Sequence, residues 1–181
     1  KFRTLGFFAA DLDPLQRTEA PYLPDLDLRT YGFTDADMDT EFDVGSLKAG
    51  TPRMRLRDII AMLRETYTRT LGLEYMYISE TPVKRFFQDR IEPTRARARY
   101  TPEQRRQILE RLTAAEGLER YLHTKYVGQK RFSGEGGDTL IPMLDHLIQR
   151  AGSEGVQEIV IGMPHRGRLN VLVNTLGKMP A

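Results

Sequence analysis

The stretch GVQEIVIGMPHRGRLNVLVNTLG, residues 155–177, decides the fold class of this chain. Its first nine residues are rich in β-branched and apolar side chains, which predicts a buried strand. Leu169, Leu172, Val173 and Leu176 recur at helical spacing and predict an inward-facing helix that Gly177 ends. A strand followed by a helix begins an α/β unit. Because a lone strand leaves its backbone groups unpaired, we expect further polypeptide beyond residue 181 to complete a parallel sheet.

The chain before this stretch carries mostly helical patterns. Apolar residues at helical spacing predict helices over 56–72, 81–92 and 101–122, and the last begins with a capping box of Thr101 and Gln104. We therefore predict an α/β class that is largely helical in this chain. Three parts are expected: an extended segment with a short helix (1–50), a helical region (51–130), and the first helix–strand–helix of an α/β domain (131–181).

Composition narrows the class of protein. The 181 residues include no cysteine, which excludes disulfides and thiolate chemistry, and the net charge is only +2. The sequence contains no apolar run of the roughly 18 residues that span a membrane. We expect no membrane partner and no nucleic-acid partner, and a location in the bacterial cytoplasm or a mitochondrial matrix.

The segment MPHRGRLN, residues 163–170, is the best candidate site. Ligands of parallel sheets bind at the carboxyl ends of strands, where His165 stands. Arg166 and Arg168 lie at the start of the next helix, where arginines oppose the helix dipole unless an anion is bound. The segment thus predicts a site for anions. The alternative is a solvated turn whose arginines pair with neighbouring carboxylates.

Other motifs give weaker signals. RFSGEGGD, residues 131–138, matches no phosphate-binding pattern and is better explained as a turn that lets segments approach closely. Asp35, Asp37 and Asp39 fail the EF-hand pattern, so we predict no metal site. His123 and His146 lack the spacing of metal ligands. The basic run near residues 85–106 suggests nucleic acid only weakly, because no recognised module surrounds it.

Several longer stretches together resemble one enzyme family. LTAAEGLERYLHTKYVGQKRFSGEGGDTLIPMLDHLIQRAG and GMPHRGRLNVLVNTLGK are similar to the decarboxylating, thiamine-diphosphate-dependent first component of the 2-oxoglutarate dehydrogenase complex. The resemblance extends through FFQDRIE and FDVGS to AADLDPL near residue 10. It covers nearly the whole chain, which we therefore expect to be an N-terminal fragment of a longer enzyme. The 2-oxoadipate dehydrogenase of the same family shares much of the pattern.

The resemblance implies a homodimeric enzyme that uses thiamine diphosphate and magnesium to decarboxylate 2-oxoglutarate. The succinyl group would pass to the lipoyl group of a succinyltransferase partner. By this likeness His165 is a catalytic histidine near the substrate, and Arg166 contacts the cofactor diphosphate or the substrate carboxylate. The family's metal-binding segment is not in this sequence, so we expect the metal ligands outside this chain and the chain alone to be inactive.

Two positions depart from the family's usual pattern. Gly134 replaces a leucine, and Phe7 replaces a histidine whose role cannot be carried over. From the residues alone, an alternative function remains: a non-catalytic helical module for protein interaction, with its arginines at the rim of the interface.

Overall fold

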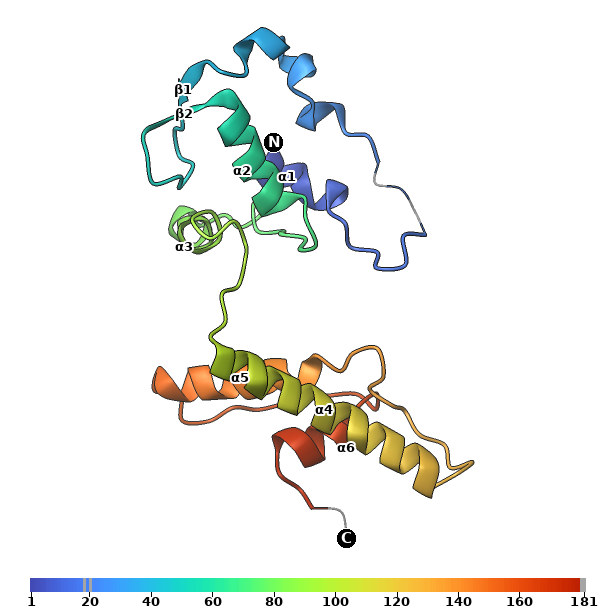
Figure 1. Ribbon diagram of the computed structural model, residues 1–181. Helices are drawn as coiled ribbons and strands as arrows, with labels where there is room; N and C mark the ends of the chain where they lie inside the picture. The colour runs from blue at the N-terminus through green and yellow to red at the C-terminus, as the bar shows by residue number, and fades with distance from the viewer. Residues whose placement is uncertain (18, 20, 180–181) are drawn as a thin grey trace. The chain divides into compact units, whose positions relative to one another are not determined.

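The computed structural model describes residues 1–17, 19 and 21–179, which form two compact units, residues 1–99 and 100–181 (Figure 1). Residues 18 and 20 of the predicted extended segment, and the last two residues of the predicted α/β part, lie outside the described residues. The boundary between the two compact units falls between Arg99 and Tyr100. The boundaries predicted at residues 50 and 130 remain a prediction. None of the helices in the described part of the chain combines the length and the hydropathy of a membrane-spanning segment.

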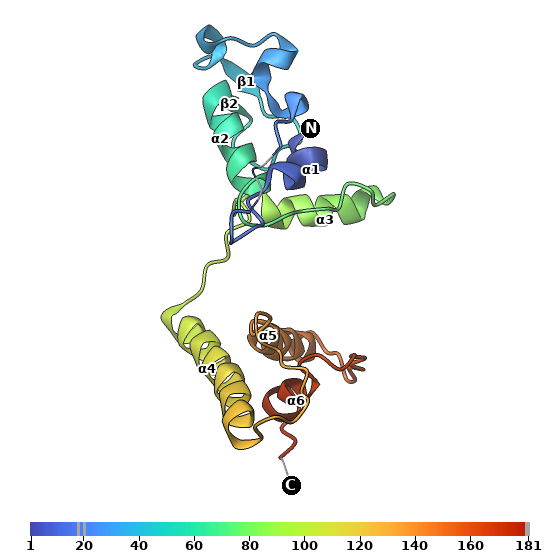
Figure 2. The same cartoon turned by 90° about the vertical axis from the view of Figure 1, so that its right-hand side faces the viewer.

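Unit 1 is built on two longer helices and several short elements. In chain order these are α1 (Phe2–Leu5), η1 (Gly6–Ala9), η2 (Pro24–Leu26), η3 (Leu28–Tyr31), η4 (Asp35–Asp37), β1 (Glu41–Asp43), β2 (Arg53–Arg55), α2 (Leu56–Tyr67) and α3 (Thr81–Ile91). The helical predictions for α2 and α3 are confirmed, but α2 ends at Tyr67, five residues before the predicted end at residue 72. Both views show α3 lying crosswise at the C-terminal end of α2 (Figures 1 and 2).

The antiparallel pair β1–β2 was not predicted from the sequence. Its central pair is Phe42 opposite Met54, and charged residues flank both of them. Each strand has three residues, too few to establish an alternating pattern. The pair brings the chain directly into α2, which begins at the residue after β2.

A buried carboxylate ties the elements of unit 1 together. Glu92, at the end of α3, is 0% exposed. Its oxygens accept hydrogen bonds from Arg3 Nε at 2.6 Å, the Tyr67 hydroxyl at 2.7 Å and the Lys48 backbone N–H at 2.8 Å. The Tyr67 hydroxyl also lies 2.9 Å from that of Tyr75. Since these partners come from α1, α2 and two loops, Glu92 fixes how those segments meet.

Two partners of Glu92, Arg3 and Tyr67, have pKa values that keep them hydrogen-bond donors to the carboxylate. Burial disfavours the charged form of Arg3, but the hydrogen bond and charge of Glu92 outweigh it and raise the pKa of Arg3. Burial, together with the hydrogen bonds to Tyr75 and Glu92, raises the pKa of Tyr67 well above its usual range. Tyr67 therefore remains a neutral donor to the carboxylate throughout the range in which proteins are usually handled.

Unit 2 is a small helical assembly. It contains α4 (Pro102–Lys125), α5 (Leu140–Ser153) and α6 (Arg168–Asn170), which continues as one turn of π-helix, η5 (Val171–Thr175). Both views place α5 and α6 beside α4 (Figures 1 and 2). Its core is the buried cluster of Ala115, Ile141 and Val171, with Leu144 and Met163 packed against it. The sequence thus predicted α4, α5 and the helical start at 168 correctly.

The predicted capping box at the start of α4 is confirmed. The Gln104 backbone N–H donates to Thr101 Oγ1 at 3.2 Å, and the Thr101 N–H donates to Gln104 Oε1 at 2.9 Å. These two bonds satisfy donors that the first turn of a helix otherwise leaves unpaired.

We expect Thr101→Ala to lower the free energy of unfolding of unit 2 by about 1 kcal/mol, because it removes the cap of the unit's longest helix. Thr113→Ala is the matched control, since Thr113 lies exposed in the middle of α4 and its hydroxyl bonds only to the Leu109 carbonyl. Amide hydrogen exchange in α4 measures both. Equal effects of the two variants would contradict a capping role.

The structure corrects two predictions about residues 155–177. Residues 156–164 form no strand, and the side chain of Val160 is 95% exposed. The physical reason is the one that applies to any lone strand: among the described residues, no second strand lies beside it to accept and donate its backbone hydrogen bonds.

The second correction concerns the helix that follows. Leu169 and Leu176, predicted to face inward, are each 51% exposed, whereas Asn170 and Val171 are buried. The π-helical turn alters the angular spacing on which the prediction relied. In addition, the Asn170 amide finds buried partners that hold it inward.

Candidate functional site

The predicted site is a tight turn between the irregular segment and α6. Gly167 has φ +69°, the left-handed conformation that glycine adopts without strain, and its N–H donates to the Phe132 carbonyl at 2.9 Å. Arg168 Nε donates to the Pro164 carbonyl at 3.1 Å. These bonds close the turn and anchor it to the glycine-rich loop, residues 131–138.

His165 and Arg166 both lie against that loop. The His165 ring packs on Phe132 with 4.0 Å between ring centroids, and Arg166 Nη1 donates to the Ser133 carbonyl at 3.0 Å. The structure therefore brings the two predicted residues together at one place. Both side chains are exposed, and they stand outside the pocket that α4 and α5 form. The site is thus an open surface in this chain.

The glycine-rich loop meets the turn closely. A Cβ atom placed on Gly167 would lie 3.5 Å from the Cα of Gly134, so the two backbones are in contact. The interpretation of this loop as a turn for close approach is confirmed. Gly134 itself has room for a Cβ at ordinary contact distances, so its place in the loop does not depend on the absence of a side chain.

A second buried carboxylate holds the loop and the turn in register. Glu119, on α4, is 2% exposed, and its Oε1 accepts from the Gly134 N–H at 3.0 Å and from Asn170 Nδ2 at 3.1 Å. Its Oε2 accepts from Arg131 Nε at 3.2 Å. Asn170 Nδ2 also donates to the Ala115 carbonyl at 2.9 Å. Glu119 thus connects α4, the loop and α6. From its buried position it holds the loop and the start of α6, and with them the turn between residues 164 and 168.

Glu119 and Asn170 were missed by the sequence analysis, although a signal existed. The apolar residues that predict α4, Ile108, Leu112, Ala115 and Leu122, share one face of the helix. Glu119 lies four residues after Ala115, on that same face. A carboxylate on a buried stripe is costly unless it is paired, so its position alone indicates buried partners.

The turn carries more positively charged side chains than carboxylates that pair with them. Arg131 is paired with Glu119, but among the described residues no carboxylate lies within 4.0 Å of the guanidinium groups of Arg166 or Arg168. Of the alternative, a solvated turn with paired arginines, the ion pairs are therefore absent from the part of the chain described, whereas His165, Arg166 and Arg168 are exposed as a solvated turn requires. Arg166 keeps most of its donors available for an anion.

The weaker candidate motifs turn out to be structural or exposed. Asp37 accepts from the Thr34 N–H at 2.8 Å and caps η4, and this hydrogen bond lowers the pKa of Asp37. Asp39 pairs with Arg57. Within the described residues, no group of three histidine, aspartate or glutamate side chains could hold a metal ion. His123 and His146 are both exposed.

Comparison with curated proteins gives extensive similarity to one group. Over 180 residues, 99% of the chain, it is 60% identical to the 2-oxoglutarate dehydrogenase E1 component of Cupriavidus necator. It is 50% identical over 179 residues to the E1 component of Azotobacter vinelandii. It is 47% identical over 184 aligned positions to the multifunctional 2-oxoglutarate metabolism enzyme of Mycolicibacterium vanbaalenii.

The matched region is a small part of each relative. The chain spans 19% of the length of the first two proteins and 14% of the third. No family model matches the sequence. The chain is therefore homologous along almost all of its length to one region of proteins about five times as long or longer.

Proposed function

We propose that this chain, whose homologues are 2-oxoglutarate dehydrogenase E1 components, forms part of such an enzyme and carries one face of its active site. The whole enzyme would decarboxylate 2-oxoglutarate and pass the succinyl group to the lipoyl group of a succinyltransferase. The observation that supports this most directly is the 60% identity across 180 residues, which cover 99% of the chain.

The turn supports a role in binding anions within that enzyme. Arg166 is exposed and donates one hydrogen bond, to the Ser133 carbonyl, so its remaining donors can reach a cofactor diphosphate or a substrate carboxylate. His165 is exposed on the same surface, where an imidazole can donate to a developing oxyanion or move a proton near neutral pH. Thiamine diphosphate would supply the electron sink for decarboxylation.

The metal site of such an enzyme would be completed elsewhere. The residues present suit one anionic contact at Arg166, but no described cluster offers the oxygen ligands that magnesium needs. We therefore place the magnesium ligands and the rest of the cofactor site on polypeptide outside this chain, in a homodimer. The unpaired residues 156–164, with Val160 exposed, would there become a strand of the completed sheet.

A chimaera tests the proposed function. These 181 residues replace the corresponding region of the Cupriavidus necator E1 component, and carbon dioxide release from 2-oxoglutarate is measured with thiamine diphosphate and magnesium. We expect activity within about tenfold of the parent enzyme, because homologous segments conserve volume and pattern in the core. A folded chimaera without activity would contradict the proposal. Preference for 2-oxoadipate would instead assign the chain to that dehydrogenase.

A further inference from the structure

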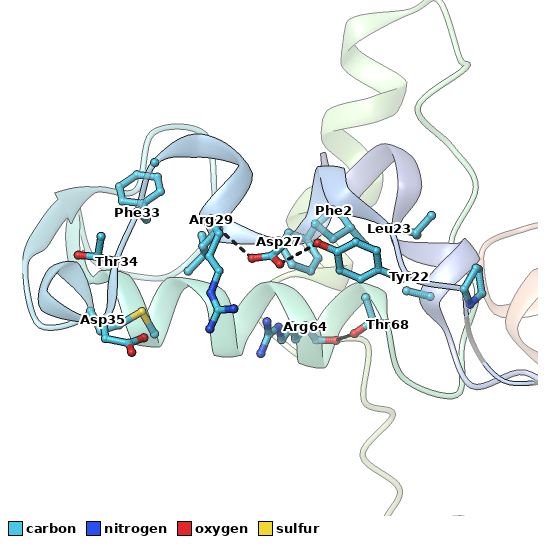
Figure 3. A pocket seen from close by; sticks show the side chains of 16 residues that line it. Phe2, Tyr22, Leu23, Asp27, Arg29, Phe33, Thr34, Asp35, Arg64 and Thr68 are labelled. Carbon is cyan, nitrogen blue, oxygen red and sulfur yellow. Dashed lines mark hydrogen bonds between the residues drawn. The ribbon is translucent and has the colours of Figure 1, made fainter.

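Unit 1 contains an open groove of about 930 Å³ that the proposed function does not use. It lies between the N-terminal residues, the η2–η3 segment and α2 (Figure 3). Much of its wall is apolar, and the larger apolar side chains that line it are Phe2, Leu23, Leu26, Leu28, Phe33 and Met38. Four charged side chains, Asp27, Arg29, Asp35 and Arg64, also line it. Sites for small ligands are typically concave and combine an apolar wall with a small number of polar groups.

Two arginines from different elements enter the groove. Arg29 comes from η3 and Arg64 from α2, and Figure 3 shows the Arg29 side chain extending over α2 in the direction of Arg64. Among the described residues, neither guanidinium forms an ion pair with a carboxylate within 4.0 Å. Both are therefore available to a ligand.

One of the two acids that line the groove, Asp27, is already engaged. Asp27 accepts from the Arg29 backbone N–H at 2.9 Å and from the Tyr22 hydroxyl at 2.9 Å. These hydrogen bonds, together with the charges of Arg29 and Arg64, lower the pKa of Asp27. Asp35 also lines the groove, so two carboxylates and two guanidinium groups balance there in formal charge. The guanidinium groups of Arg29 and Arg64 are nevertheless the positively charged donors of this lining, and among the described residues they form no ion pair.

We propose that this groove binds a small organic oxyanion, a carboxylate or phosphate group carried on an apolar body. Arg29 and Arg64 would take the oxyanion, because the guanidinium fork matches the oxygens of either group. The apolar wall would cover the body of the ligand, and Tyr22, oriented by Asp27, would flank it. The inference does not depend on the proposed function, since the groove lies within unit 1 and the turn within unit 2.

The test is a titration of the ¹⁵N-labelled 181-residue chain with phenyl phosphate, benzoate and inorganic phosphate, followed by amide chemical shifts. We expect saturable shifts at the groove residues Gly32, Thr34 and Thr68. Phenyl phosphate or benzoate should bind at least about tenfold more tightly than inorganic phosphate, because only they bury an apolar body. The tighter of the two identifies the oxyanion.

A double variant, Arg29→Gln with Arg64→Gln, should weaken binding by more than about tenfold, since each guanidinium provides charged hydrogen bonds. Arg105→Gln is the matched control: Arg105 is exposed on α4 in the other unit, and its loss removes a charge of the same sign. The proposal is overturned if no probe gives saturable shifts, if the double variant binds as the parent does, or if the control loses as much affinity.

Discussion

Glu92→Ala is expected to lower the free energy of unfolding of unit 1 by about 3–5 kcal/mol, because it removes one partner of a buried ion pair and leaves the other unpaired. The Arg3 guanidinium, the Tyr67 hydroxyl and the Lys48 backbone N–H would all lose their acceptor. Amide hydrogen exchange in α2 measures the loss. An effect of this size would be a large fraction of the stability of a unit with so small a core.

Two further variants separate charge from position. Glu92→Gln keeps one carbonyl oxygen in place, so we expect it to cost less than the alanine variant. Asp89→Ala is the matched control, because Asp89 pairs with Lys48 Nζ at 2.8 Å but is half exposed, and an exposed pair contributes about 1 kcal/mol or less. The account fails if Asp89→Ala destabilises unit 1 as much as Glu92→Ala does.

Glu119→Ala is expected to destabilise unit 2 by about 3 kcal/mol and to release the turn that carries His165. The Gly134 N–H and the Asn170 amide would lose an acceptor, and Arg131 would lose the carboxylate with which it pairs. The amides of Gly134 and Gly167 should then exchange faster than the rest of the unit. Amide hydrogen exchange followed by nuclear magnetic resonance measures both quantities: the slowest amides of unit 2 give its free energy of unfolding, and the amides of Gly134 and Gly167 report whether the turn has become mobile.

Glu116→Ala gives the control for this prediction. Glu116 lies on the same helix, pairs with Arg120 on the surface and is well exposed, so its loss should change stability by about 0.5 kcal/mol or less. Glu119→Gln should retain part of the stability, because an amide oxygen can still accept from the Gly134 N–H. If Gly134 and Gly167 stay protected in Glu119→Ala, Glu119 does not position the turn.

The longer helices could be predicted because the residues that favour each helix lie close together in the sequence. The apolar stripe of α2 and the capping box of α4 each depend on residues within one or two turns. The turn at residues 164–168 was also predictable, since glycine beside arginines after an apolar run indicates a change of backbone direction. Its contact with the loop at Phe132 and Ser133 depends on segments about thirty residues away, and no local pattern encodes it.

The predictions that went wrong relied on context that the described residues do not provide. Residues 156–164 have the composition of a strand, but composition does not supply hydrogen-bonding neighbours. The inward face of the helix after the turn was assigned from leucines, whereas Asn170 is held inside by Ala115 and Glu119. Both buried carboxylates are satisfied by partners distant in sequence, which a search for local motifs does not find.

The most direct test of the account is His165→Ala in the chimaera with the Cupriavidus necator E1 component, assayed by carbon dioxide release from 2-oxoglutarate. We predict a fall in kcat of at least about 100-fold with an unchanged unfolding temperature, because a group that transfers a proton or stabilises charge contributes on that scale. His146→Ala, which removes another exposed histidine of unit 2, should leave the rate unchanged. Activity of His165→Ala equal to that of the His146→Ala control would contradict the account.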